Sequence, residues 1–449
     1  MIHTRIGDKA AIKPDTIRDA YRLSHPPVVD GCRLVIPPTD QEESHGDSAP
    51  WQVAINLIKC AVGAGSFSLP AAWRAAGFWA ALGLTVSLGA LAALTACMLV
   101  ACERRMSHEA GRRLTYPELL LGTFPGRQGS VLHAIAAIGI TFTSVGVCVA
   151  YVDFIVGVLT GLLHRPQYEV MVLLFPIVLG LALLRSFRYL ACTSILGDVA
   201  VAAGLVGTVS FGVAQGATFT PPSALPAVNI SEIPQAAGNI AFLFLIHAVV
   251  LPIAQSMRPD RTDQFHSVTG TFAPSARSFA NVAWSSYAVI TLGNVAFGGI
   301  CYSLFAEETA PNVVLNLNSG SAGVVTIQLL LCVDLLFTIP MVLAAGREIC
   351  EGYAMTSGLG VMHAPATRTL TRLVLVLAIF STAAAIPSFG DVVSLIGGLS
   401  NALLGLILPP LLHSPQHLSP AHMISLLGAA LLLSSTFFTI RGIMKTVAV

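Results

Sequence analysis

The chain has 449 residues, of which 54% are hydrophobic and only 10% are charged, and its mean hydropathy is +0.75. A soluble domain of this size would have roughly 25% charged residues. So few charges cannot cover a surface that faces water, and most of the chain must therefore have lipid as its solvent. The net charge is +1, so no basic excess indicates a nucleic-acid partner.

The titratable residues form no pattern typical of a cofactor site. Most of the nine cysteines lie inside apolar runs, where cysteine behaves as a small hydrophobic residue. No CxxC pair or His/Cys cluster indicates a metal, and no nucleotide motif or Ser/His pair is visible. We expect no metal, no cofactor, no essential disulfide and no enzymatic activity.

Apolar runs long enough to cross a bilayer follow one another along the chain. A helix needs roughly 20 apolar residues for this. About eleven runs meet the requirement, which predicts an all-α polytopic membrane protein; they are centred on 53–73, 78–101, 131–158, 169–185, 191–213, 237–257, 281–305, 322–345, 371–387, 391–412 and 421–440. We expect residues 1–50 to form a disordered cytosolic tail and residues 51–449 to form the transmembrane domain, whose first helix acts as the insertion signal.

The positive charges predict an orientation in the membrane. With the N-terminal tail in the cytosol, most arginines fall in inside loops, whereas the 214–236 and 306–321 loops contain no Lys or Arg. Asn229 begins an N-x-S sequon in the first of these outside loops, which predicts a glycosylation site. An odd helix number places the C-terminus outside, where Arg441 and Lys445 agree less well with the rule.

The first apolar run predicts a broken helix. Gly63, Gly65 and Pro70 lie about halfway across it. A helix in lipid must satisfy its own backbone, so a break there would expose free amides and carbonyls. Amides favour a carboxylate and carbonyls favour an ammonium, and together they suit a zwitterionic amino acid. The alternative is that the glycines only allow close helix packing.

The sixth run repeats this pattern, because Phe244, Leu245, Ile246 and His247 are followed by Pro252. His247 is either a proton-responsive group or ligand contact, or else a hydrogen-bonded packing residue. Broken helices at corresponding places in two halves of a transporter indicate its binding site.

Lys59 lies inside the first run, about one turn before Gly63. An ammonium inside a membrane is costly and usually functional. It either replaces a bound sodium ion or carries protons, and the alternative is that it snorkels towards a headgroup. Asp153 and Asp334 lie deep enough in their runs to pair with it, whereas Asp198 is expected near the inner end of the fifth helix.

An ordered series of motifs accompanies these residues. The segment from Asn56 to Pro70 is similar to N-L-x-K-x-x-x-G-x-G-x-x-x-L-P, and later segments follow in order: Thr115 to Leu119, Val147 to Tyr151, Gln328 to Leu330, Thr338 to Pro340, Arg347-Glu348, Ile386 to Asp391 and Leu408 to Pro410. On these motifs the chain resembles the amino acid/auxin permease family, closest to its proton-coupled amino acid transporter branch, over roughly residues 51–440.

The resemblance implies a LeuT-type fold, a 5+5 inverted repeat plus one extra helix. It also implies substrate binding at the two breaks, at Val62, Gly63, Ala64, Gly65, Ser66, Phe244, Leu245, Ile246 and His247. Coupling in this fold involves helices one and eight, here through Lys59 and Thr338. Sodium-coupled members tend to have Asn where this chain has Lys59, which favours proton coupling or uniport. The branch typically has an acidic residue near the sixth-helix break, and this chain departs from that pattern.

These observations predict a secondary active amino acid transporter that works by alternating access and is either proton-coupled or sodium-independent; protons are the expected coupling ion, and the lipid bilayer is its surroundings. The alternative is a membrane sensor that binds amino acids without moving them. Both the plasma membrane and a vacuolar or lysosomal-type membrane are compatible with the sequence.

Overall fold

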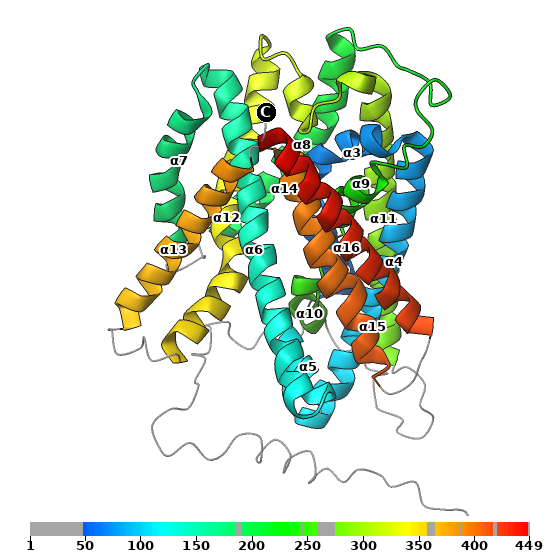
Figure 1. Cartoon of the computed structure of the whole chain (residues 1–449), viewed down its shortest axis with the longest axis vertical. Helices are drawn as coiled ribbons and strands as arrows, with labels where there is room; N and C mark the ends of the chain where they lie inside the picture. Colours follow the sequence, from blue (N-terminus) through cyan, green and yellow to red (C-terminus); the bar gives the residue numbers. More distant parts are fainter. Residues whose placement is uncertain are drawn as a thin grey trace, which may run out of the picture.

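The computed structural model describes residues 48–184, 190–244, 246–257, 274–356, 364–386, 388–415 and 420–447 (Figure 1). Every regular element in these ranges is a helix. The predicted tail lies almost wholly outside the described residues, as do Leu245 and Pro387.

The helices follow the predicted runs closely. The first half of the chain contains α2 (Pro50–Ala61), the 3₁₀ turn η1 (Ala64–Ser68), α3 (Leu69–Ala76), α4 (Phe78–Ala110), α5 (Tyr116–Thr123), α6 (Gly126–Leu163), α7 (Gln167–Ala182) and α8 (Leu190–Ala214). The second half contains α9 (Ile233–Phe242), α10 (His247–Gln255), α11 (Pro274–Phe305), η2 (Ala306–Glu308), η3 (Val313–Asn316), α12 (Ala322–Thr356), α13 (Ala364–Ala385), α14 (Phe389–Ile396), the π-helix η5 (Gly397–Ile407), α15 (Leu408–His413) and α16 (Pro420–Val447).

The number of membrane crossings agrees only in part with the prediction of about eleven. Nine spans in the described ranges are long and apolar enough to cross a bilayer, and the bent pair Pro50–Ala61 and Ala64–Ala76 brings the number to ten. The remaining predicted crossing is α7, which has only 16 residues. Because roughly 20 residues are needed to cross the hydrocarbon core, an eleventh crossing stays a prediction.

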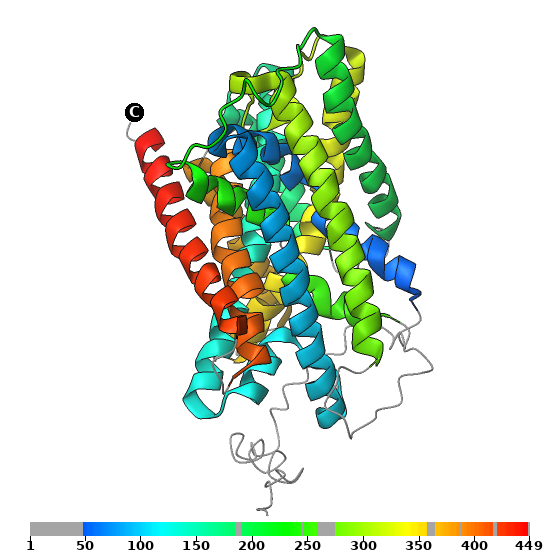
Figure 2. The ribbon, with the colours of Figure 1, turned by 90° about the vertical axis from the view of Figure 1, so that its right-hand side faces the viewer.

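The two ends of the helical body differ in their loops. We call the end that contains α5 and the arginines of the 103–127 region the inner end, following the positive-inside rule (Figure 1). The opposite, outer end contains the end of α3 and the connection from α8 to α9. The last helix, α16, ends at the outer end, as the predicted topology requires (Figures 1 and 2).

The buried apolar side chains form two separate clusters. The first contains α2, α3, α4, α9, α10 and α11, which we call the bundle, together with side chains of α5, α6, η5, α15 and α16. The second contains α6, α7, α8, α12, α13 and α14, which we call the scaffold, together with side chains of η3 and α11. The turn η1 contributes Ala64 and Phe67 to the scaffold cluster, although its chain belongs to the first span. The two bodies therefore meet at the break in the first span.

Candidate functional site

A cavity of about 350 Å³ lies between the bundle and the scaffold. The bundle contributes residues 59–65 of the first span and Phe242, Ala248 and Val249 of the sixth. The scaffold contributes side chains from the middle and inner parts of α6, from α8 and from α12. The cavity thus lies where the two helix breaks face the scaffold. Its size is within the range of small-molecule sites.

The first break has the predicted free backbone groups. Helix α2 ends at Ala61, and the chain is extended at Gly63 before η1 begins, with a bend of 46° between the two arms. The first backbone bond of η1 runs from the Ser66 amide to the Gly63 carbonyl, over 3.0 Å. Within the described residues, no backbone carbonyl accepts from the amides of Gly63, Ala64 or Gly65. Three amides at the start of η1 therefore remain available next to the cavity.

The two glycines of this break have different roles. A Cβ on Gly65 would lie 2.6 Å from the ring of Phe242, so Gly65 permits close contact between the first and sixth spans. A Cβ on Gly63 would meet no atom within 4 Å, because Gly63 borders the cavity. Gly65 therefore allows close helix packing, whereas Gly63 belongs to the open backbone of the break.

The sixth span breaks between the end of α9 at Phe242 and the start of α10 at His247. The Asn401 side-chain amide donates to the Ala241 carbonyl over 2.8 Å, which satisfies one carbonyl at the end of α9. From this span the cavity is lined by Phe242, Ala248 and Val249. The break was therefore predicted at the correct place, but the side chains that border the cavity differ from the predicted ones.

Several predicted substrate residues do not line the cavity. His247 is fully buried, and its Nε2 lies 2.9 Å from the Thr95 hydroxyl of α4. Phe244 stacks on Tyr287 of α11, and Ile246 is also buried in the bundle core. Ser66 is buried and outside the lining as well. The cause is helical phase, because the chain rotates within the break and turns these side chains into the bundle.

The Lys59 ammonium forms an ion pair with the carboxylate of Asp198, not with Asp153 or Asp334 as the sequence suggested. Lys59 lies in the last turn of α2, and Asp198 lies about two turns inside α8. The pair therefore joins the bundle to the scaffold across the cavity. The two side chains remain 33% and 40% exposed. A cation in the last turn also interacts favourably with the helix dipole.

Thr338 and Lys59 line the same cavity, as the resemblance implied. The Thr338 hydroxyl donates to the Asp334 carbonyl over 2.8 Å and lies 3.5 Å from the Asp334 Oδ1. Asp334 also lines the cavity, beside Gly197 of α8. Sequence reasoning did not predict that Asp198 and Asp334 would lie together, because no pattern in one chain specifies which faces of α8 and α12 meet.

The interface is densely packed on the outer side of the cavity. The ring of Phe67 lies 5.8 Å from that of Phe154 and 5.9 Å from that of Phe297, and the rings of Phe154 and Phe389 are 5.7 Å apart. All four side chains are buried. We call these four residues the aromatic cluster.

Hydrogen bonds reinforce this closure. The hydroxyl of Ser68 lies 2.8 Å from the Asn239 Oδ1, and the Asn239 Nδ2 donates to the Gly390 carbonyl over 3.4 Å. The Gln235 Nε2 donates to the Asp391 Oδ1 over 2.6 Å. These bonds connect η1 and α9 of the bundle with α14 of the scaffold, and Asp391 lies in the first turn of α14. We call these side chains the outer polar network.

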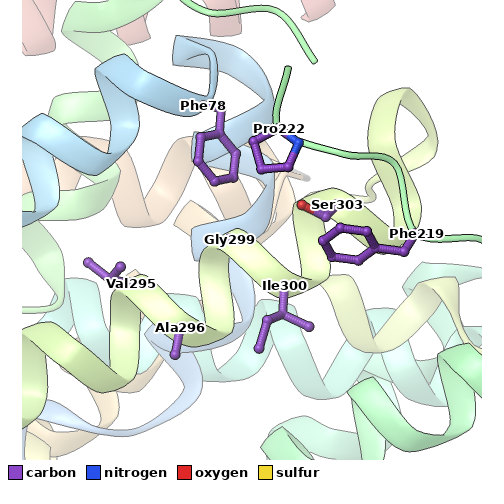
Figure 3. A pocket seen from close by; sticks show the side chains of 8 residues that line it. All are labelled: Phe78, Phe219, Pro222, Val295, Ala296, Gly299, Ile300 and Ser303. Carbon is purple, nitrogen blue, oxygen red and sulfur yellow. The ribbon is translucent and has the colours of Figure 1, made fainter. Parts of the chain in front are cut away.

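A second, smaller hollow of about 220 Å³ lies at the outer end, between the start of α4, the α8–α9 connection and α11. Figure 3 shows the rings of Phe78, Pro222 and Phe219 along one side and Val295, Ala296, Gly299, Ile300 and Ser303 of α11 along the other. This lining contains no charged side chain to recognise a zwitterion. The larger cavity is therefore the candidate substrate site.

Asn229 is exposed in the outer connection between α8 and α9. Its backbone amide donates to the Ala76 carbonyl at the end of α3 over 2.8 Å, and its side chain accepts from Ser231. The sequon is therefore close to the outer ends of the helices, and its glycosylation stays a prediction.

Comparison with known proteins gives a family match over most of the chain. The family described as "Transmembrane amino acid transporter protein" matches residues 46–425. Amino acid transporter ANT1 of Arabidopsis thaliana is 27% identical over 398 residues, covering 83% of this chain and 86% of the relative. Amino acid transporter AVT3C of the same plant is 27% identical over 412 residues, with 85% and 87% covered. Sodium-coupled neutral amino acid transporter 7 of Mus musculus is 24% identical over 412 residues, with 84% and 82% covered.

Solved transporter structures share the fold. The inward-facing conformation of Mhp1 matches with a TM-score of 0.54 at 12% identity, covering 90% of this chain and 92% of that one. A manganese transporter of Eremococcus coleocola matches with a TM-score of 0.51 at 15% identity, with 93% and 88% covered. Both comparisons support the LeuT-type fold that the resemblance implied.

Proposed function

This chain belongs to the family of transmembrane amino acid transporters, and we propose that it is a secondary active transporter that works by alternating access and is driven by protons rather than sodium. Family membership makes it a multi-pass membrane transporter and not an enzyme. One observation supports the mechanism most: the cavity lies between two bodies with separate apolar cores, at the two helix breaks. Two such bodies can rock against each other around a bound substrate.

The backbone at the first break supports an amino acid as substrate. The free amides of Gly63, Ala64 and Gly65 bind the substrate carboxylate, since amides at the start of a helical turn attract anions. The carbonyls at the end of α2, of Lys59, Cys60 and Ala61, accept no backbone bond among the described residues and bind the ammonium. The substrate side chain then faces the remaining cavity wall.

The substrate side chain meets a mostly apolar wall that also contains polar groups. Phe242 and Val249 from the sixth span and Val147, Tyr151 and Leu335 from the scaffold border this space. Apolar walls favour apolar amino acid side chains. We therefore expect neutral amino acids to be better substrates than acidic ones.

Lys59 supports independence from sodium. Its ammonium lies between the bundle and α8 and already neutralises Asp198 there. A fixed ammonium between the two bodies supplies the positive charge that a bound sodium ion would otherwise supply. The relative named as sodium-coupled makes sodium the competing coupling ion, and the experiment below distinguishes the two.

The test is uptake of a labelled mixture of the standard amino acids into liposomes that contain the purified protein. It is performed with and without an inward proton gradient, each time with and without sodium. We expect accumulation only under the proton gradient, whether or not sodium is present. A requirement for sodium would overturn the coupling proposal, and specific binding without uptake under any gradient would favour the sensor.

Lys59→Ala is the variant that tests the role of the ammonium. It removes the tie to Asp198 and leaves that carboxylate without a partner in the cavity. We expect uptake to fall at least about tenfold, because an unpaired charge inside a membrane protein is costly. Unchanged uptake with unchanged pH dependence would show that Lys59 has no part in coupling.

A further inference from the structure

The cavity contains more negative than positive charge. Three charged side chains line it among the described residues: Lys59, Asp198 and Asp334. Lys59 is paired with Asp198, and no described Lys, Arg or His forms an ion pair with Asp334. With all three groups ionised, the site has a surplus of one negative charge.

The packing holds Asp334 close to this ion pair. A Cβ on Gly197 would lie 1.9 Å from the Asp334 Oδ1, so the carboxylate lies directly against the backbone of α8. The next residue on α8 is Asp198, the partner of Lys59. Only glycine at position 197 allows this approach, which brings the Asp334 carboxylate against the residue that precedes Asp198 in the wall of the cavity that Lys59 also lines.

The other titratable groups around the cavity supply no further compensating charge, because the cation among them, Lys59, is already paired with Asp198. They are Asp198 on α8, Lys59 and Cys60 on α2, and Tyr151 on α6, all of which line the cavity. Asp198 follows Gly197, whose backbone the Asp334 carboxylate contacts, so the nearest charge on α8 has the same sign as Asp334. The Thr338 hydroxyl lies 3.5 Å from the Asp334 Oδ1, but it donates its hydrogen to the Asp334 backbone carbonyl.

An unneutralised carboxylate at this depth is unfavourable, and a proton or a bound cation removes the cost. We propose that Asp334 is the group that takes up and releases the coupling proton, while Lys59 remains paired with Asp198. This inference depends on the proposed proton-driven transport and specifies which residue performs it. A proton requires no further ligands, whereas a sodium ion at Asp334 would share the cavity with the Lys59 ammonium, which repels it.

The proposed step is a simple proton transfer. When the site faces outward, the Asp334 carboxylate accepts a proton from water on the outer side and becomes a neutral carboxylic acid. When the site faces inward, the acid returns the proton to water on the inner side. One proton then crosses with each substrate.

The variant Asp334→Asn separates coupling from transport. Asparagine has the shape of the neutral acid but cannot release a proton, so the carrier would cycle with its substrate and without a proton. We expect exchange of labelled for unlabelled amino acid to persist. Accumulation under an inward gradient of one pH unit, about tenfold for one proton per substrate, should disappear.

The experiment compares four proteins in the same liposomes: the wild type, Asp334→Asn, Asp334→Glu and the control Asp153→Asn. Asp153 is a second scaffold carboxylate, only 7% exposed, and it does not line the cavity. Uptake and exchange of the labelled amino acid mixture are measured with a trapped pH dye that reports proton entry. Wild type and control should accumulate substrate and acidify the interior, and Asp334→Glu should keep coupling with a shifted pH optimum.

The outcomes distinguish this inference from the proposed function. If the wild type shows no proton-driven accumulation, the proposed coupling itself fails. If the wild type is proton-driven and Asp334→Asn still accumulates substrate and acidifies the interior, Asp334 is not the coupling group. Loss of exchange in both Asp334→Asn and Asp334→Glu would indicate a structural role and also overturn the inference, as would loss of coupling in the Asp153→Asn control.

Discussion

The inner and outer parts of the interface between bundle and scaffold are built differently. The inner part contains a cavity with Lys59, Asp198 and Asp334 on its wall. The outer part is filled by the aromatic cluster and joined by the outer polar network. Charges near the cavity can meet water, whereas the outer closure depends on rings and on bonds worth about 0.5–1.5 kcal/mol each. Bonds this weak can break in every cycle, which is what an alternating gate requires.

The largest expected effect comes from the contact that joins the two breaks. In Gly65→Ala, the added methyl group would lie 2.6 Å from the Phe242 ring and force that ring towards the cavity. We expect stability to fall by about 1–3 kcal/mol, as in other overpacked cores, and uptake to fall about tenfold or more. Thermal unfolding of the purified protein and liposome uptake measure the two effects.

Gly63→Ala is the matched control for stability, because its added methyl group meets no atom within 4 Å. We expect its stability to stay within about 0.5 kcal/mol of the wild type. Replacing Phe242 by Leu in the Gly65→Ala background should recover part of the loss. Equal destabilisation by the two alanine variants would contradict the different roles assigned to the two glycines.

A smaller effect is expected from weakening the outer closure. Ser68→Ala removes the hydroxyl that contacts the Asn239 Oδ1 and so orients this amide, whose Nδ2 donates across the interface to the Gly390 carbonyl of α14; the outer side should therefore open more often. Cys60 lines the cavity and serves as the reporter in a protein whose other cysteines are replaced. We expect its labelling by an impermeant thiol reagent from the outer side to rise about 2–10-fold, the population shift that one hydrogen bond produces.

The control for this experiment is Ser286→Ala. Ser286 is a buried serine of α11 whose hydroxyl donates to the Val282 carbonyl of its own helix. It should leave Cys60 labelling unchanged. An equal rise in both variants would mean that the Ser68 contact does not hold the outer side closed.

The smallest expected effect tests which end of the helical body is the outer end. In Asn229→Gln, produced in eukaryotic cells, we expect the loss of a glycan that a glycosidase removes from the wild type, with uptake unchanged. Gel mobility before and after digestion measures this. If the glycosidase leaves the mobility of the wild-type protein unaltered, Asn229 carries no glycan, and glycosylation no longer supports the assignment of this end as the outer end.

The sequence by itself determined where the helices lie and where the first and sixth spans break. Both depend on local rules: the thickness of the hydrocarbon core sets the run length, and Gly63 and Pro70 interrupt a backbone that must otherwise bond to itself. The motif series was also sufficient to indicate the family.

Only the tertiary structure decided which side chains meet. Lys59 pairs with Asp198, and Asp334 joins them beside Gly197, because α2, α8 and α12 present particular faces to one another. His247 contacts Thr95 of the bundle because the chain turns within the break, and a hydropathy pattern does not specify this rotation. Side-chain partners across helices depend on rotation and packing, which residues far apart in the sequence set together.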